Sequence, residues 1–393
     1  MPRDDLRLLI SRRRFLRLAS TGLAALGVGV GVGVAGCSRP DSDLDRGAAT
    51  TGAGAGTSAG AGGAHFDGAL ALYSWEEYSS PENLAAFTER FGATVGVEFY
   101  DSNEQLISAL QEGRPSDVVA PSNSYLPQLI AGGLLTALDH DRLPNLANVD
   151  PAFLGHPWDP DDAYAVVKSW GSTGFIYDTT VIREDLSSWA DYFRVAGQEG
   201  VSGKVSALEE RSVVDAALWR EGFDFRTDDP VELDRAEQIL TDELLPHLLA
   251  LNSFPVDELL DGSYVLSQAF SGDARIVVLE FPERYRWVLP TPHTELWIDH
   301  WAIPSTSERP EAAHAFIDYM LAPNVSAREL SHHGYATAVN GIDEFLPFDL
   351  PASDMVFFEP ESLGRMLSYE APATEERRNE LVAALLAGID ARG

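Results

Sequence analysis

Polar and aromatic side chains follow three predicted strands of this sequence, where ligand contacts gather in α/β proteins. The strands end near Tyr73, Tyr100 and Pro121, and predicted helices alternate with them. Because the carboxyl ends of parallel strands meet at one edge of a sheet, we expect the following side chains to share a site. These side chains are Trp75, Glu76, Tyr78, Asp101, Ser122, Ser124 and Tyr125.

A further candidate is an acid inside an apolar strand. Asp299 lies between Ile298 and His300. A buried carboxylate needs a partner. That partner is either a ligand cation or a local arginine or backbone amide, and the sequence leaves both alternatives open.

The known catalytic signatures are missing from the sequence. There is no His-Glu-x-x-His motif, and the only cysteine is Cys37. Residues 56–60 match Gly-x-Ser-x-Gly, but no predicted strand or helix flanks them. His332-His333 lacks a spaced third ligand, and residues 159–162 lack the glycine and final glutamate of a calcium loop. We expect no enzyme activity, no metal and no cofactor, with a surface-tethered hydrolase as a remote alternative.

The elements that carry these residues alternate between strand and helix. Strands are predicted at residues 70–73, 94–100, 117–121, 287–290 and 301–304. Helices are predicted after the capping signals at 79–82 and 102–105, and at 231–251, 312–321 and 375–390. This alternation predicts an α/β fold with parallel sheet. The chain beyond residue 65 is too long for one small sheet, so we expect two lobes.

Charge excludes one class of partner. The 393 residues contain 28 Lys+Arg and 61 Asp+Glu, for a net charge of −33, so no basic surface for nucleic acid is expected. The 45% hydrophobic content excludes a wholly disordered chain. Only Lys168 and Lys204 are lysines. We interpret this acidity as adaptation to high salt, and therefore not as evidence for a cationic ligand.

The first 65 residues predict export and anchoring. Residues 11–17 match a twin-arginine export pattern, an apolar run covers 18–34, and Val-Ala-Gly-Cys at 34–37 resembles a lipobox. Residues 1–37 are thus predicted to be a signal peptide with lipid attachment at Cys37, and 38–65 a Gly/Ala-rich tether. The expected location is the extracellular face of the cell membrane.

Several ordered motifs resemble the spermidine/putrescine-binding group of ABC-importer solute-binding proteins. They include Trp-Glu-Glu-Tyr at 75–78, Trp-x-Asp at 297–299 and Gly-Tyr-x-Thr at 334–337. Other matching segments are 100–104, 117–122, 143–151, 170–174 and 270–274. Together they cover nearly all of 68–340 in the family's order, and with the acidity they suggest a haloarchaeal member.

The resemblance implies a two-lobed clamp of the periplasmic-binding-protein type, with a hinge and a ligand cleft between the lobes. Lobe 1 would comprise 66–172 plus 298–343, and lobe 2 would comprise 173–297 plus 344–393. Hinge strands would lie near 169–174 and 297–302. The implied function is capture of a polyamine by a monomer that delivers it to a membrane permease.

The resemblance also implies the ligand contacts. A polyamine needs carboxylates at its ammonium groups and aromatic faces along its methylenes. The implied residues are Trp75, Tyr78, Ser122, Ser124, Glu209 or Glu210, Phe270, Asp273, Trp297, Asp299 and Tyr335.

Two departures from the family pattern favour a shorter or less charged amine than spermidine. Ser124 stands where spermidine-type members carry a ring, and Ser212 or Val213 replaces a second acid. Another small amine or a quaternary ammonium solute is the alternative ligand. Trp75, Trp297 and Tyr335 could instead be core packing, and Asp273 could cap a turn.

Overall fold

A computed structural model describes residues 64–347, 349–368 and 375–392. The predicted signal peptide, Cys37 and the tether up to residue 63 lie outside the described residues. Residues His65–Gly393 form one compact unit. Within the described ranges, no helix is both long and apolar enough to cross a membrane.

The first elements alternate as the sequence predicts. They are β1 (Ala69–Ser74), α2 (Pro81–Phe91), β2 (Thr94–Phe99), α3 (Asn103–Gln111) and β3 (Val118–Val119). The side chain of Ser80 caps α2, and that of Ser102 caps α3 by accepting a hydrogen bond from the Gln105 amide at 3.2 Å. Each cap fixes the start of its helix, and so also the loop that joins the helix to the end of the preceding strand.

The long strand β5 (Ala165–Asp178) follows a region of short helical turns and is buried along all 14 residues. The other strands are β4 (Leu135–Thr136), β6 (Val205–Ala207), β7 (Leu248–Leu251), β8 (Leu266–Phe270), β9 (Tyr285–Val288), β10 (Thr294–Pro304) and β11 (Met366–Ser368). The other α-helices are α4 (Leu126–Ala131), α5 (Trp189–Ala196), α6 (Ser212–Glu221), α7 (Pro230–Gln238), α8 (Val256–Asp261), α9 (Ser271–Glu280), α10 (Pro310–Met320), α11 (Pro323–His333), α12 (Pro360–Leu363) and α13 (Glu375–Asp390).

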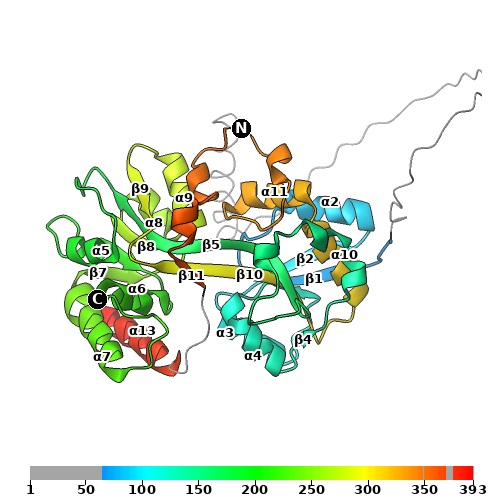
Figure 1. The fold of residues 1–393 in the computed structure, drawn as a ribbon, viewed down its shortest axis with the longest axis horizontal. Coiled ribbons are helices and arrows are strands. Elements are labelled where there is room, and N and C mark those ends of the chain that lie inside the picture. Colours follow the sequence, from blue (N-terminus) through cyan, green and yellow to red (C-terminus); the bar gives the residue numbers. More distant parts are fainter. Residues whose placement is uncertain (1–63, 348, 369–374, 393) are drawn as a thin grey trace, which may run out of the picture. The chain divides into compact units, whose positions relative to one another are not determined.

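Two long strands join the halves of the sheet. Its order is β2-β1-β3-β10-β5-β8-β6-β7, with β4 and β11 beside β10 and β9 beside β5. The outer pairs β1–β2, β1–β3, β6–β7 and β6–β8 are parallel, whereas β10 is antiparallel to β3 and β5. Figure 1 shows β5 and β10 running side by side between the two groups of elements.

Hydrophobic burial follows the same division. One cluster joins buried residues of β1, β3, the first part of β5, the last part of β10, α10 and α11, and half-buried side chains of β2 pack against it. A second joins the last part of β5 to α5–α7 and α13, and a third packs between α8, α9 and β9. Val356 and Met366 belong to the first cluster although they lie beyond residue 343. The lobe boundaries given above stay a prediction.

The long helix predicted at 231–251 is wrong over its last part. Helix α7 passes into a π-helical turn (Ile239–Leu244), a 3₁₀ turn (Leu245–His247) follows, and Leu248–Leu251 is strand β7. Pro246 cannot donate the hydrogen bond that an α-helix needs. The apolar residues that follow it pair with β6 in the sheet.

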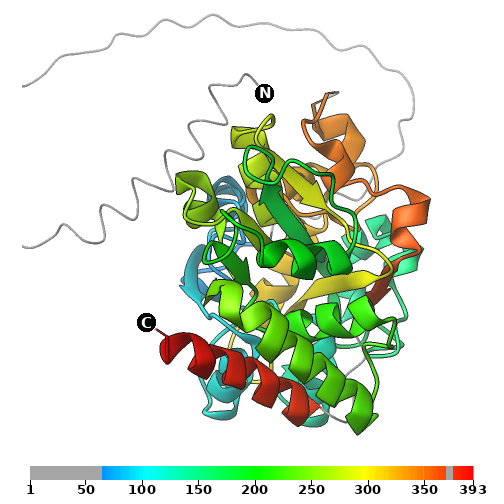
Figure 2. The same cartoon turned by 90° about the vertical axis from the view of Figure 1, so that its left-hand side faces the viewer.

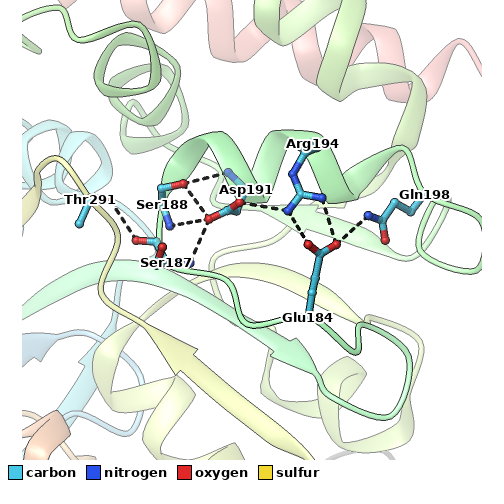
Figure 3. Close-up of polar contacts among 7 residues, drawn as sticks. All are labelled: Glu184, Ser187, Ser188, Asp191, Arg194, Gln198 and Thr291. Carbon is cyan, nitrogen blue, oxygen red and sulfur yellow. Dashed lines mark hydrogen bonds and ion pairs between the residues drawn. The ribbon is translucent and has the colours of Figure 1, made fainter.

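Helix α5 is fixed by a polar network at its start (Figure 3). Ser188 and Asp191 form a reciprocal capping box, and Arg194 bridges Asp191 and Glu184 at 2.9–3.0 Å. Thr291 ties the preceding loop to the β9–β10 connection through the Ser187 carbonyl at 3.0 Å. These contacts fix the start of α5 against the β9–β10 connection, beside the second hydrophobic cluster.

The last helix packs on this same cluster. Figure 2 shows α13, in red, lying along the green helices α6 and α7. Arg378 of α13 is fully buried and donates to the Thr227 carbonyl at 3.0 Å. Leu381 and Leu385 fill the apolar contact, so the amphipathic helix predicted at 375–390 is confirmed.

Candidate ligand-binding site

One face of β10 carries an acid, an indole and a second acid. Glu295, Trp297 and Asp299 are two residues apart, so their side chains share a face of the strand. Trp297 pairs with Gly171 of β5, and Asp299 pairs with Ser169. At a rise of about 3.4 Å per residue, the Cα atoms of Glu295 and Asp299 lie about 14 Å apart along the strand.

Asp299 is held by hydroxyl groups. Its Oδ2 accepts from Tyr78 Oη at 2.7 Å, and its Oδ1 accepts from Ser122 Oγ at 2.7 Å. The Tyr78 hydroxyl also lies 2.6 Å from Ser169 Oγ. The side chain is 7% exposed, and this burial raises the pKa of Asp299 although both hydrogen bonds and Lys168 act to lower it.

The loops that bring these hydroxyls are fixed from behind. The amide group of Asn103 bonds both the backbone amide and the Oγ of Ser122, each at 3.1 Å. The turn before Tyr78 contains Glu77 at φ +52°, in the left-handed region that side chains rarely adopt. Burial and the charge of Asp299 hold the pKa of Tyr78 well above its usual value, so its hydroxyl keeps the proton that it donates.

Lys168 lies directly behind Tyr78. The pairing of β5 with β10 shifts at this point and skips Lys168. Its Nζ donates to the Tyr78 carbonyl at 2.7 Å, lies 3.5 Å from the Tyr78 ring centroid and is 3.6 Å from Glu329 Oε2. Burial lowers the pKa of Lys168 to about 8, against the attraction of Glu329 and Asp299.

Three half-buried rings meet over the middle of the β10 face. Trp297 stands edge-to-face with Tyr335 at 4.9 Å and with Phe270 at 6.0 Å between centroids. Glycine is required beneath two of them, because a Cβ on Gly171 would lie 2.4 Å from the Trp297 ring and one on Gly272 2.3 Å from the Tyr335 ring. The rings therefore lie directly against backbone.

The other acid of this face lies in a charged network. Glu295 is buried, accepts from Thr173 Oγ1 at 2.8 Å and lies 3.5 Å from the guanidinium of Arg211. Glu210 is half-buried beside them. Burial and repulsion from Glu295 raise the pKa of Glu210 to about 7, although Arg211 and Ser212 act to lower it.

The structure brings most of the predicted site residues together. Tyr78, Ser122, Asp299, Trp297, Tyr335 and Phe270 lie together around the β10 face. Asp273 lies in the first turn of α9 and accepts from Tyr335 Oη at 3.3 Å, so it positions that ring. Glu210, rather than the exposed Glu209, faces Glu295.

Two predicted residues lie at the edge of this arrangement. Trp75 packs on Tyr100 with 4.5 Å between ring centroids and donates from Nε1 to the Ala120 carbonyl at 3.0 Å, and these contacts hold its ring in place. Ser124 is half-buried in the turn after β3, one residue from Asn123, which accepts from the Ile298 amide at 3.2 Å.

Sequence reasoning missed four polar residues of the site. They are Lys168, Ser169, Arg211 and Glu295. A signal was present for Glu295, since it stands two residues before Trp297 and four before Asp299. A signal was also present for Lys168, because it is one of only two lysines in the sequence and follows the apolar residues Ala165-Val166-Val167.

The described residues give no support for a metal centre. Within residues 64–347, 349–368 and 375–392, no group of three or more His, Cys, Asp or Glu side chains could hold an ion. Asp159 accepts from the amides of Ala163, Tyr164 and Ala165, which confirms a turn there. His333 ends α11, as expected for a helix end.

The chain is similar to known extracellular and periplasmic binding proteins. A family model described as bacterial extracellular solute-binding protein matches residues 82–347. The chain is 31% identical over 292 residues to spermidine/putrescine-binding periplasmic protein 1 of Haemophilus influenzae, covering 73% of this chain and 79% of that protein. It is 30% identical over 280 residues to the spermidine/putrescine-binding periplasmic protein of Escherichia coli, covering 70% and 79%.

The fold agrees as well. The structure of the spermidine/putrescine ABC transporter substrate-binding protein of Streptococcus pneumoniae superimposes with a TM-score of 0.70 at 25% identity, covering 82% of this chain and 99% of that one. The expected two-lobed binding-protein fold is thereby confirmed.

Proposed function

Because the chain belongs to the family of bacterial extracellular solute-binding proteins, we propose that it captures a small polyamine and delivers it to the membrane permease of an ABC importer. Proteins of this family bind and release a solute without covalent chemistry. The relatives named for spermidine and putrescine set the ligand class proposed for this chain.

The observation that carries the proposal is the order of groups on β10. Two carboxylates stand on either side of an indole, and Tyr335 and Phe270 bring further rings to that indole. Ammonium groups bind to carboxylates, and the methylenes between them pack on aromatic faces with cation–π support. An amine with two ends and an apolar middle matches this order.

Contact pairs rather than net charge must supply the affinity. The acidic surface attracts any cation, but in molar salt the Debye length is about 3 Å and this attraction is screened. Asp299 is buried and bonded by two hydroxyls, so its interaction with an ammonium at contact distance is screened much less. The Asp299 carboxylate is therefore the group that selects a cation.

We propose that β5 and β10 act as the hinge. Strand β5 carries residues of the first hydrophobic cluster and, further along, of the second, and β10 pairs with it between Ala165 and Ser172, where Trp297 and Asp299 lie. A ligand held between them would contact residues of both halves, because Tyr78 and Ser122 belong to one half and Glu210 and Phe270 to the other. Closing on the ligand would then bring these contacts together.

Attachment to the cell surface is the finer part of the proposal. The twin-arginine pattern and the lipobox support export and a lipid anchor on Cys37. The excess of acids over bases supports a high-salt habitat. A monomer with a tethered binding domain is the expected unit.

A second ligand class is a quaternary ammonium solute. The three rings of Trp297, Tyr335 and Phe270 favour it, because such cations bind in aromatic cages. A ligand of this class has no N–H to donate to Asp299, so it would depend on the rings and little on the carboxylate.

Thermal unfolding of the purified full chain in high-salt buffer tests these assignments. The chain is stripped of carried-over ligand and heated with putrescine, cadaverine, spermidine, spermine, betaine or an amino acid. A ligand that binds only the folded state raises its stability by about 2.7 kcal/mol at a hundredfold excess over Kd. We expect the melting temperature to rise with one or two amines and not with amino acids.

The pattern of shifts separates the alternatives. A shift with betaine alone would replace the polyamine by a quaternary ammonium ligand. No shift with any amine would leave the fold and family intact and refute the polyamine assignment.

A further inference from the structure

Arg211 places a fixed positive charge at one end of the candidate site. Its guanidinium lies 3.5 Å from Glu295, and the two side chains are only 10% and 7% exposed. A buried ion pair of this kind persists in high salt, because screening acts mainly on exposed charges. The cation is therefore a permanent part of this end.

The position of Arg211 is set by the helix that it begins. Its carbonyl accepts from the amides of Val214 and Asp215 in the first turn of α6. This helix packs against α13 and α7, so the backbone of Arg211 is anchored by the core. A bound amine must accommodate the guanidinium rather than displace it.

Formal charges at the two ends balance in the same way. Among the buried and half-buried groups, Glu295 and ionised Glu210 face Arg211, which leaves one net negative charge at that end, while Glu104, the other acid near Glu210, is exposed. At the other end Asp299 and Glu329 face Lys168, which again leaves one. Two single negative charges on either side of Trp297 match a ligand that carries two positive charges.

A longer ligand could extend in only one direction. Asp299 is buried among Tyr78, Ser122 and Ser169, which close its end of the face. Additional chain must run past Trp297 toward Glu295, where it meets the guanidinium. A third ammonium there would lie against a like charge.

We propose that Arg211 is a specificity-determining residue that restricts the ligand to a short diamine and rejects triamines and tetraamines. This inference rests on the proposed function and names the substrate class within it. Arg211 acts through charge and position, and Glu295 serves to hold its guanidinium in place.

The test is the ratio of dissociation constants for spermidine and putrescine, measured by calorimetry on the full chain. We expect the unaltered protein to bind putrescine at least tenfold more tightly than spermidine. In Arg211→Gln, which keeps a group able to bond Glu295 but removes the charge, that ratio should fall at least tenfold. Arg211→Lys should keep the preference.

Arg220→Gln is the matched control. Arg220 lies on the same helix and forms an ion pair with Glu243 at 2.7 Å, so its loss changes the net charge equally. The ratio should not change in this variant. An equal fall in Arg220→Gln, or an unchanged ratio in Arg211→Gln, would overturn the role of Arg211.

A second test measures the affinity of the unaltered protein for a series of amines and needs no variant. Across putrescine, cadaverine, spermidine and spermine, affinity should decrease with each added ammonium. Equal or tighter binding of spermidine would overturn the inference while leaving the polyamine function intact. Failure to bind any amine would instead refute the proposed function, and this inference with it.

Discussion

The two ends of the β10 face hold their acids in different ways. Asp299 is surrounded by hydroxyl donors, from Tyr78 and Ser122, with Lys168 at longer range. Glu295 has a hydroxyl donor in Thr173 and a guanidinium in Arg211. Both acids are buried, so burial alone does not distinguish them.

The difference shows which carboxylate is available to a ligand. Neutral hydroxyls solvate a carboxylate without cancelling its charge, so Asp299 retains an attraction for an incoming cation. Arg211 already neutralises Glu295, which leaves Glu210 as the second attractive group. The Asp299 end should therefore contribute more affinity, and the Glu210 end should contribute discrimination and pH dependence.

Asp299→Asn should have the largest effect on binding. The variant keeps the shape of the side chain but removes the charge opposite the ligand ammonium. Loss of one member of a buried, hydrogen-bonded charge pair costs about 2–5 kcal/mol, so putrescine affinity should fall by at least about 30-fold. Calorimetric titration of the full chain measures it.

Asp117→Asn is the control for this substitution. Asp117 is equally buried and accepts from the Ala71 amide at 2.9 Å and from Ser307 Oγ at 2.8 Å, outside the site. It should lose stability and keep its affinity. Equal affinity losses in both variants would mean that Asp299 acts only on the fold.

Lys168 should give stability an unusual pH dependence. Its pKa is about 8 in the fold and 10.5 when unfolded, so the unfolded chain binds more protons between these values. Stability should therefore rise from about pH 8 to about pH 10.5, by about 2–3 kcal/mol. Denaturant unfolding across this range measures it.

The Lys168→Met variant should lose this rise. Lys204→Met is the control, because Lys204 is the other lysine and is exposed. Subtracting its curve removes contributions from other groups. An identical slope in both variants would show that Lys168 has no perturbed titration.

The sequence was sufficient to predict those features that depend on residues close together in the chain. Predicted strand ends pointed to Tyr78 and Ser122, and the Trp-x-Asp motif shared with the polyamine-binding group added Trp297 and Asp299; the structure brings these four side chains together. The capping serines of α2 and α3 were also identified correctly. These features depend on neighbours in the chain, which a sequence displays.

The features that the sequence did not reveal depend on register and tertiary pairing. Lys168 reaches Tyr78 because the β5–β10 register shifts there. Arg211 and Glu295 are 84 residues apart and meet only when α6 packs beside β10. The helix predicted through Pro246 failed for the same reason, since pairing with β6 decided that segment.

Gly171→Ala should weaken binding through the ring cluster. A Cβ at this position would lie 2.4 Å from the Trp297 ring, so the indole must move away from the β10 face. The loss of ring contact is worth about 1–2 kcal/mol, or about 5- to 30-fold in putrescine affinity. Calorimetry measures this loss, and indole fluorescence reports the moved ring.

Gly96→Ala is its matched control. Gly96 lies in strand β2, and a Cβ there meets no atom within 4 Å. This variant should bind as the unaltered protein does. Unchanged affinity in Gly171→Ala would show that the Trp297 ring does not contact the ligand.

Glu210 should make binding mildly pH-dependent, and this is the smallest expected effect. Its pKa of about 7 means that the ligand-free protein holds a proton there below neutral pH. The groups that face it are Glu295, Arg211, Ser212 and Glu104. A bound cation favours the ionised carboxylate, so binding must release that proton.

Putrescine affinity should therefore increase by about fivefold between pH 6 and pH 8, at a cost of about 1 kcal/mol at the lower pH. Glu210→Gln should bind more weakly and show no such increase, whereas Glu209→Gln, with an exposed side chain, should retain it. An unaltered slope in Glu210→Gln would place the titrating group elsewhere. Loss of the slope in Glu210→Gln together with a preserved Asp299→Asn defect would establish that the two ends contribute separately, since one end then sets the pH response and the other sets the affinity.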